Sequence, residues 1–142
     1  MLHLQELTNQ REQTRTLLIT ERLPHFLLAP CVLNVAYQVK AEDDYYLIQL
    51  GVEGVFTIQC QRCLQDFSYP YTNKTCIAVC STDERAASLL EYYECIVSSN
   101  NQVVLEELVI DELHLYAPQY HLDESECDIE VMQLLNGKNE TY

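Results

Sequence analysis

Glycine and proline are scarce in this chain of 142 residues, which contains three glycines and four prolines. Hydrophobic residues make up 48% of the sequence, so a disordered tail, a collagen-like repeat and a flexible linker are all excluded. Three glycines also cannot supply a glycine-rich loop around a phosphate group. The length fits one domain with a single core.

Basic residues are also few. Eight Lys and Arg residues stand against 22 Asp and Glu, which leaves a formal net charge of −14. Most of the surface is therefore expected to repel a nucleic-acid backbone, and a basic protein is the easier partner. A negative net charge can also serve solubility alone. It therefore argues against a nucleic-acid partner more firmly than it identifies a protein partner.

The chain lacks a long apolar run and a secretion signal. Stretches such as residues 77–80 fall far short of the ~20 residues that cross a bilayer, and the start, Met1-Leu-His-Leu-Gln-Glu, has neither a basic region nor an apolar core. We therefore expect a cytoplasmic protein without a membrane partner. The seven cysteines are irregularly spaced and odd in number, which predicts reduced thiols, as at Cys31, Cys76, Cys80 and Cys95.

Apolar and polar residues alternate with the two-residue period of strands along much of the first hundred residues. An acidic turn at residues 41–44 separates the first two strands, and Gly51 and Gly54 predict a turn or bulge before the third. This order is typical of an antiparallel meander. The predicted strands are residues 33–39, 45–50, 55–59, 75–80 and 93–97.

Three segments have helical features, and they are residues 21–28, 83–91 and 104–116. The last has the clearest helical spacing of apolar residues and ends before Pro118. Its other residues predict an acidic, solvated face, made of Glu106, Glu107, Asp111 and Glu112. Residues 1–30 as a whole have no clear periodicity, and we expect them to be partly mobile.

The stretch "TIQCQRCLQD", residues 57–66, places Cys60 and Cys63 at the end of a predicted strand. A C-x-x-C turn can direct both sulfurs at one tetrahedral zinc ion, and His121 and Cys127 can complete the ligand set. Redox exchange is the second reading, although it needs a helix N-terminus at the first cysteine. The third is two reduced thiols beside a turn.

Other catalytic signatures are missing. The sequence contains neither H-E-x-x-H nor G-x-S-x-G, and no histidine is placed by its spacing as the base for a cysteine nucleophile. Arg62, between the two cysteines, can pair with a phosphate or with a nearby acid. These observations predict a protein that is not an enzyme and has no small-molecule substrate.

The order of the motifs resembles the YceD family. The resemblance rests on "IQCQRCLQDF" after a β-rich half, an acidic middle helix, and "VVLEELVIDELHLYAPQYHLDESEC". It covers most of the chain from about the third strand onward. The matching positions are Cys60, Arg62 and Cys63 in the knuckle, Asp111, Glu112, Leu113, Ala117 and Pro118 at the helix end, and His121 and Cys127 in the late cluster. Many relatives have a second Cys-x-x-Cys in the late region, where this chain has Cys127 alone.

The resemblance implies a cytoplasmic bacterial protein that is needed for normal accumulation of large-subunit ribosomal RNA. Genes of this family typically lie beside the gene of a basic large-subunit ribosomal protein, and no enzymatic activity is established for the family. Zinc is the cofactor that the knuckle would hold.

We therefore predict an α+β fold with an antiparallel sheet of four to six strands and a few packed helices. Residues 1–30 form an N-terminal segment, residues 31–142 form one domain, and the 104–116 helix packs near the knuckle. The predicted function is non-catalytic ribosome biogenesis through a basic ribosomal or processing protein, with Arg62 and the acidic helix face, Glu106, Glu107, Asp111 and Glu112, as contacts. The alternative is direct binding of large-subunit precursor RNA through Arg62, Lys74, Tyr69 and Tyr71.

Overall fold

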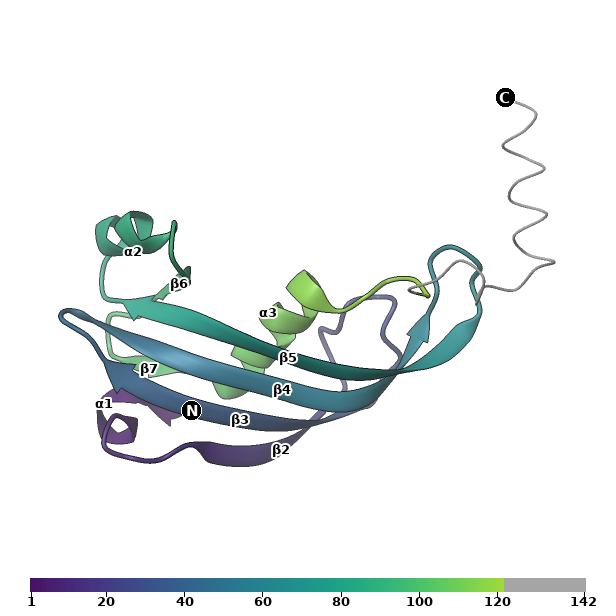
Figure 1. The fold of residues 1–142 in the computed structure, drawn as a ribbon, viewed down its shortest axis with the longest axis horizontal. Helices are drawn as coiled ribbons and strands as arrows, with labels where there is room; N and C mark the ends of the chain where they lie inside the picture. Colours follow the sequence, from purple (N-terminus) through teal and green to yellow (C-terminus); the bar gives the residue numbers. More distant parts are fainter. Residues whose placement is uncertain (122–142) are drawn as a thin grey trace, which may run out of the picture.

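The structure, a computed structural model, describes residues 1–121 of the chain. In this part of the chain a five-stranded sheet is covered by helices and by a short two-stranded sheet (Figure 1). The fold is α+β, as predicted. The strands are β1 (Leu2–His3), β2 (Gln13–Ile19), β3 (Cys31–Ala41), β4 (Tyr45–Gln59), β5 (Asp66–Cys80), β6 (Glu94–Val97) and β7 (Gln102–Val103), and the helices are α1 (Leu4–Leu7), α2 (Asp83–Leu89) and α3 (Leu105–Tyr116).

The centre of the sheet is an antiparallel meander in the order β2-β3-β4-β5. The alternation predicted a meander from β3 onward but did not identify β2. One part of that prediction is wrong: β4 is a single strand of 15 residues, without a turn at Gly51 and Gly54. Gly54 serves a close approach, because a Cβ atom there would lie 2.7 Å from the carbonyl oxygen of Val32. Gly54 therefore allows the backbone of β3 to pack closely against β4, and it does not introduce a turn.

The sheet becomes mixed at its far edge, where β6 pairs parallel with the last residues of β5. The crossover between these strands contains α2, whose N-cap residue Thr82 accepts a hydrogen bond from the backbone N–H of Arg85 at 3.2 Å. Since β6 covers only Ile77–Cys80 of β5, the earlier part of β5 is an open edge. An open edge tolerates Pro70, which has no N–H to donate.

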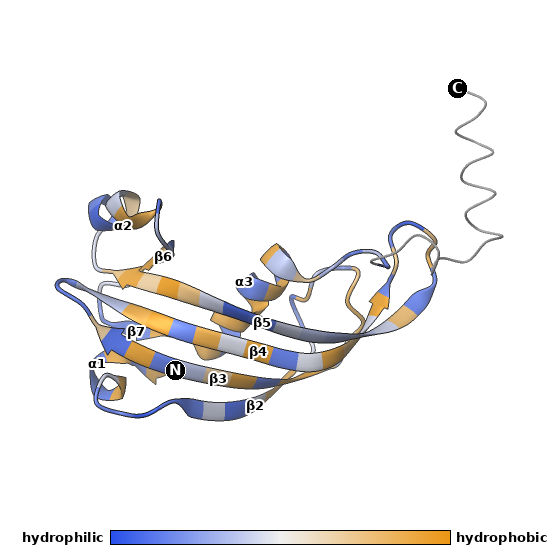
Figure 2. Cartoon of the chain, in the orientation of Figure 1, coloured by the Kyte–Doolittle hydropathy of each residue, from blue (hydrophilic) through white to orange (hydrophobic). Residues whose placement is uncertain are grey.

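The two faces of the sheet pack against different helices. One face, with alternate buried residues of β3 and β4, forms the main core with α3 and the N-terminal residues Leu2 and Leu4. The opposite face is covered at one end, where Leu47 and Ala78 pack against Leu89 of α2. The alternation of apolar and polar residues along the long strands is visible in Figure 2. No helix in residues 1–121 has the length and apolar character of a membrane span.

Residues 1–30 contribute to the same sheet and core. Strand β2 pairs with β3, and Ile19 and Phe26 are buried in the main cluster. The predicted helix at residues 21–28 is wrong: the segment is irregular, and Leu27 forms an isolated bridge with Ile58 of β4. Its leucines pack onto the end of β4, so tertiary contact outweighs the local helical signal. The mobility of residues 1–30 stays a prediction.

Candidate metal centre

The two cysteines of the C-x-x-C motif lie in the connection between β4 and β5, residues 60–65. The backbone N–H of Leu64 donates to the carbonyl oxygen of Cys60 at 2.7 Å, and the N–H of Cys60 donates to Gln65 at 2.9 Å. Leu64 has a φ of 65°, in the left-handed region that tight turns require. These bonds form a knuckle in which both thiols point to one side.

The chain returns to this knuckle after α3. The N–H of Gln61 donates to the carbonyl oxygen of Gln119 at 2.8 Å. The guanidinium of Arg62 donates to the carbonyl oxygen of His121 and lies over the ring of Tyr120, 5.3 Å from its centroid. The segment after α3, residues 117–121, is thus attached to the knuckle through its backbone. This segment, and not α3 itself, makes these contacts with the knuckle, so the packing of the 104–116 helix near the knuckle stays a prediction.

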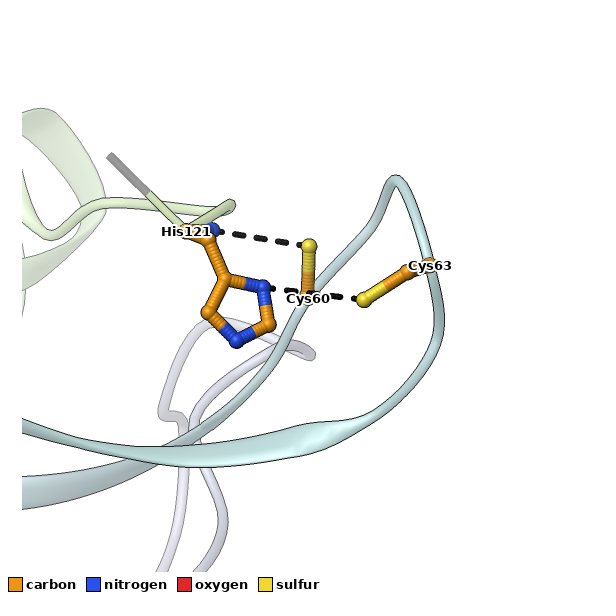
Figure 3. Close-up of side chains that lie close together, drawn as sticks. All are labelled: Cys60, Cys63 and His121. Carbon is orange, nitrogen blue, oxygen red and sulfur yellow. Dashed lines mark hydrogen bonds between the residues drawn. The ribbon is translucent and has the colours of Figure 1, made fainter. Parts of the chain in front are cut away.

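His121 completes a group of three ligand atoms (Figure 3). The Sγ atom of Cys63 is 3.6 Å from Nδ1 of His121, and the Sγ atom of Cys60 accepts a hydrogen bond from the His121 backbone N–H at 3.5 Å. The ligand atoms of the three residues all lie within 4.8 Å of one another. Cys60 and Cys63 are fully buried and His121 is 7% exposed.

These distances can be compared with the geometry of zinc. Sulfur at about 2.3 Å and nitrogen at about 2.0–2.1 Å from one ion, at a tetrahedral angle, are about 3.6 Å apart. The separation between Cys63 Sγ and His121 Nδ1 has this value without any rearrangement. This pair of donors therefore matches a tetrahedral ion of the zinc type, and the Sγ atom of Cys60 lies within 4.8 Å of both atoms as a candidate second sulfur ligand.

Electrostatics at Cys60 favour the form that binds metal. Burial raises the pKa of the Cys60 thiol, but backbone amides of Cys63, His121 and Arg62 donate to the sulfur and lower the pKa to about 5. A thiolate is the species that coordinates a metal. Two buried thiols away from the knuckle differ, since desolvation raises the pKa of Cys31 and of Cys80.

Phe67 was not identified from the sequence. Its ring stacks on the imidazole of His121, with centroids 4.1 Å apart and an angle of 27° between the planes. Phe67 also packs against the two cysteines, so it holds the imidazole in position and closes the site to water. An aromatic residue four positions after the second cysteine was the only sequence signal for this role.

The redox reading of the motif fits the structure less well, whereas two reduced, buried thiols beside a turn remain compatible with it. Cys60 follows a strand, whereas a low-potential redox pair places its first cysteine at a helix N-terminus. Both sulfurs are inaccessible, which removes them from contact with a substrate. Cys127, the fourth predicted ligand, lies outside the described residues.

The predicted partner-binding residues fall into two groups. Glu106, Glu107 and Asp111 are exposed on α3, as expected. Glu112 is only 2% exposed, so its assignment to a solvated face is wrong. It lies seven residues after Leu105 and four after Leu108, on the buried stripe of the helix, and this spacing was readable in the sequence. Arg62 is occupied within the protein by His121 and Tyr120.

The residues proposed for RNA binding do not form one patch. Tyr71 is 4% exposed and stacks on Phe56, on the core side of β5. Lys74 is exposed and, by the alternation of side chains along the strand, lies on the opposite face from Tyr69 and Tyr71. Arg62 sits in the knuckle. The face of β5 was not fixed from its sequence, because only residues 75–80 were predicted as a strand, whereas β5 begins at Asp66.

Two comparisons with known proteins bear on the identity of the chain. The sequence model of one protein family, described as "Large ribosomal RNA subunit accumulation protein YceD", matches residues 48–142. This match spans β4, β5, α2 and α3 and includes the knuckle and His121. No solved structure matches the chain.

Proposed function

The chain belongs to the YceD family, and on this basis we propose that it supports the accumulation of large-subunit ribosomal RNA without catalysing a reaction. We propose further that it does so by binding a basic ribosomal or rRNA-processing protein. The family match supports the role in ribosome biogenesis. The distribution of charge supports a basic protein as the partner, and it is the main observation behind the proposed mechanism.

Acidic groups are concentrated on exposed elements. Glu106, Glu107 and Asp111 lie on one helix, and Asp83 and Glu84 lie on another. Carboxylates on rigid helices create a steady negative field that accelerates encounter with a cationic protein. We define the acidic face as Glu106, Glu107 and Asp111.

Several cations of the chain are engaged by its own groups. Arg85 pairs with Asp44 at 2.9 Å and lies over the ring of Tyr45, and Arg22 approaches Glu107 at 3.8 Å. Arg62 is held by His121 and Tyr120. These arginines lie on separate elements, which does not favour a continuous groove for an RNA backbone.

The test combines binding and function. The purified protein is immobilised, and binding of basic ribosomal proteins is measured from low to high salt. The gene is also deleted and replaced by a variant with Glu106→Gln, Glu107→Gln and Asp111→Asn, and large-subunit rRNA is quantified. We expect binding to weaken with salt and the variant to restore less rRNA than the wild type. Salt-independent binding, or full restoration by the variant, contradicts the proposed mechanism.

We also propose that Cys60, Cys63 and His121 bind a structural zinc ion, with Cys127 as the fourth ligand. The ion would neutralise the thiolates and fix residues 117–121 to the knuckle, so the segment after α3 would depend on it. Elemental analysis of protein purified without chelator tests this. We expect close to one equivalent of zinc, which Cys63→Ser lowers and the control Cys95→Ser does not. Less than about a tenth of an equivalent in the wild type contradicts a closed structural site.

A further inference from the structure

A second site lies away from the knuckle, between α3 and the edge of the sheet. A pocket of about 350 Å³ opens there, with lining residues from β5, β6 and α3. We call it the α3 pocket. Its walls include Ile77, Ile96 and Leu108, and three carboxylates line it, from Glu94, Asp111 and Glu112. This size is at the low end for ligand sites, near ~300 Å³, and suits a single side chain better than a whole cofactor.

Glu112 is the central group of this pocket. Its Oε1 atom accepts a hydrogen bond from the Asn73 side chain at 2.8 Å. Its Oε2 atom is buried and, like the hydroxyls of Tyr71 and Thr75, makes no hydrogen bond of regular geometry among the described residues. The Tyr71 hydroxyl is nonetheless close enough to the carboxyl to lower the pKa of Glu112. Tyr71, Asn73 and Thr75 alternate along β5 and therefore face α3 together. Burying a carboxylate oxygen without a good hydrogen bond costs free energy. The Glu112 carboxylate is therefore expected to accept a hydrogen bond from a donor that enters the pocket.

The carboxyl groups of the pocket have no compensating Lys or Arg among the described residues. The pKa of Glu112 is raised to about 7, chiefly by burial and in the same direction by the nearby Glu94, while hydrogen bonds from Asn73 and Tyr71 lower it. Glu94 itself is half-buried and accepts a hydrogen bond from the hydroxyl of Tyr116. Within residues 1–121, no ion pair involves Glu94, Asp111 or Glu112. His114 also lines the pocket, and its Nε2 atom is 2.8 Å from the carbonyl oxygen of Arg22.

We propose that the α3 pocket receives an arginine side chain presented by a partner protein, with the guanidinium between Glu112 and Glu94 and the aliphatic stem against Ile77, Ile96 and Leu108. This inference rests on the proposed function for the basic character of the partner. It goes further in naming the site and the side chain that the site accepts.

Arginine fits this pocket better than lysine does. The guanidinium is planar, carries five N–H donors, and can serve Glu112 Oε2, Glu94 and a neighbouring hydroxyl at the same time. It is also less strongly hydrated than an ammonium group, which lowers the cost of entering a site with apolar walls. The stem of the side chain buries apolar surface on those walls.

The inference is tested with the full-length protein and three blocked tripeptides, acetyl-Gly-X-Gly-amide, in which X is arginine, lysine or citrulline. Binding is followed through the backbone amide signals of the ¹⁵N-labelled protein. We expect saturable shifts at residues 94–96 and 108–115 with the arginine peptide and weaker shifts with lysine. We expect none with citrulline, which keeps the shape of arginine without its charge.

Matched variants locate the site. Glu112→Gln removes the buried charge and should weaken arginine binding at least about tenfold, because a hydrogen-bonded ion pair is lost. Glu94→Gln should also weaken arginine binding. It therefore tests the site independently if Glu112→Gln does not fold. The control Glu91→Gln removes one exposed charge outside both the α3 pocket and the acidic face and should change the affinity less than about twofold.

Three results overturn the inference: equal binding of the arginine and citrulline peptides, shifts confined to other residues, or equal loss in Glu112→Gln and Glu91→Gln. These results are independent of the proposed function, which is decided by the salt-dependent binding of basic ribosomal proteins. If Glu112→Gln leaves peptide binding intact while changes on the acidic face abolish capture of the partner, the pocket fails and the proposed function stands. If the peptide binds as expected and no basic protein is captured, the proposed function fails and arginine recognition stands.

Discussion

The Nδ1 atom of His121 lies 3.6 Å from the Sγ atom of Cys63, although 58 residues separate the two in the sequence. The contact joins the loop between β4 and β5 to the segment that follows α3. It is supported by the backbone hydrogen bond from Gln61 N–H to the Gln119 carbonyl oxygen and by the hydrogen bond from the Arg62 guanidinium to the His121 carbonyl oxygen. The site is therefore a junction between the sheet and the chain that leaves its covering helix.

Arg62 should be a positioning residue for the metal centre. Arg62→Ala removes the hydrogen bond to the His121 carbonyl and the contact with Tyr120, and we expect zinc affinity to fall about 10- to 100-fold, as for other groups that orient ligands. Competition with a chelating dye measures this. The control is Arg22→Ala, which removes an exposed ion pair with Glu107. Zinc affinity equal to that of the wild type in Arg62→Ala would show that His121 is oriented by other contacts.

Leu64 occupies a backbone conformation that suits glycine. Its φ is 65°, and its side chain is 56% exposed, so little apolar burial is lost on truncation. Leu64→Gly should raise the free energy of unfolding by about 1 kcal/mol, because the steric cost of the left-handed conformation disappears. Urea denaturation of zinc-saturated protein measures the change. Leu64→Ala keeps the Cβ atom and should gain nothing, and a gain as large as that of glycine would refute the explanation.

The two glycines of β4 should respond oppositely to alanine. A Cβ atom at Gly54 would lie 2.7 Å from the Val32 carbonyl oxygen and 3.0 Å from Leu33 Cδ2. Gly54→Ala should therefore destabilise the protein by about 1–3 kcal/mol. At Gly51 the nearest atoms would be 3.9 Å away, so Gly51→Ala should be neutral or stabilising by up to about 1 kcal/mol. Thermal unfolding compares the pair, and equal effects would contradict the role given to Gly54.

Glu112 should make stability fall as the pH rises. Burial raises its pKa from 4.5 to about 7 in the folded protein, so between these values the folded state holds more protons than the unfolded state. The contribution of the neutral acid is complete below about pH 4.5 and is lost as the pH rises through about 7, at a cost on the order of 2 kcal/mol.

Glu112→Gln stays uncharged and should lack this part of the pH dependence. Free energies of unfolding measured at intervals from pH 4.5 to 8 should converge with those of the wild type at the acidic end and exceed them at the basic end. Glu106→Gln, an exposed change on the same helix, should follow the wild-type slope. Parallel curves for the wild type and Glu112→Gln would show that Glu112 is ionised throughout.

Local patterns were sufficient for much of the fold. Alternation identified β3 and the start of β4, and helical spacing with a following proline identified α3 within one residue of its observed start. They failed where a tertiary contact outweighed them. Residues 21–28 pack on the end of β4 instead of forming a helix, and Gly54 marks a close approach of two backbones instead of a turn.

The candidate site also has a part that the sequence predicted and a part that only tertiary contacts decided. The C-x-x-C motif and His121 were identified from residue type and spacing, because zinc accepts few kinds of ligand. The stacking of Phe67 on His121 and the location of the α3 pocket were not identified. Both depend on which residues of β5 and β6 face the segment around α3, and no single segment of sequence contains that information.

The sequence by itself determined the type of most elements, the acidic character of the chain and the identity of two candidate metal-binding thiols, since each follows from neighbouring residues or from composition. Only the tertiary structure decided that His121 meets those thiols and that Glu112 is turned inward beneath α3. The physical reason is that both outcomes are set by the pairing register of the long strands and by the docking of α3 on the sheet. These bring together residues that are far apart along the chain.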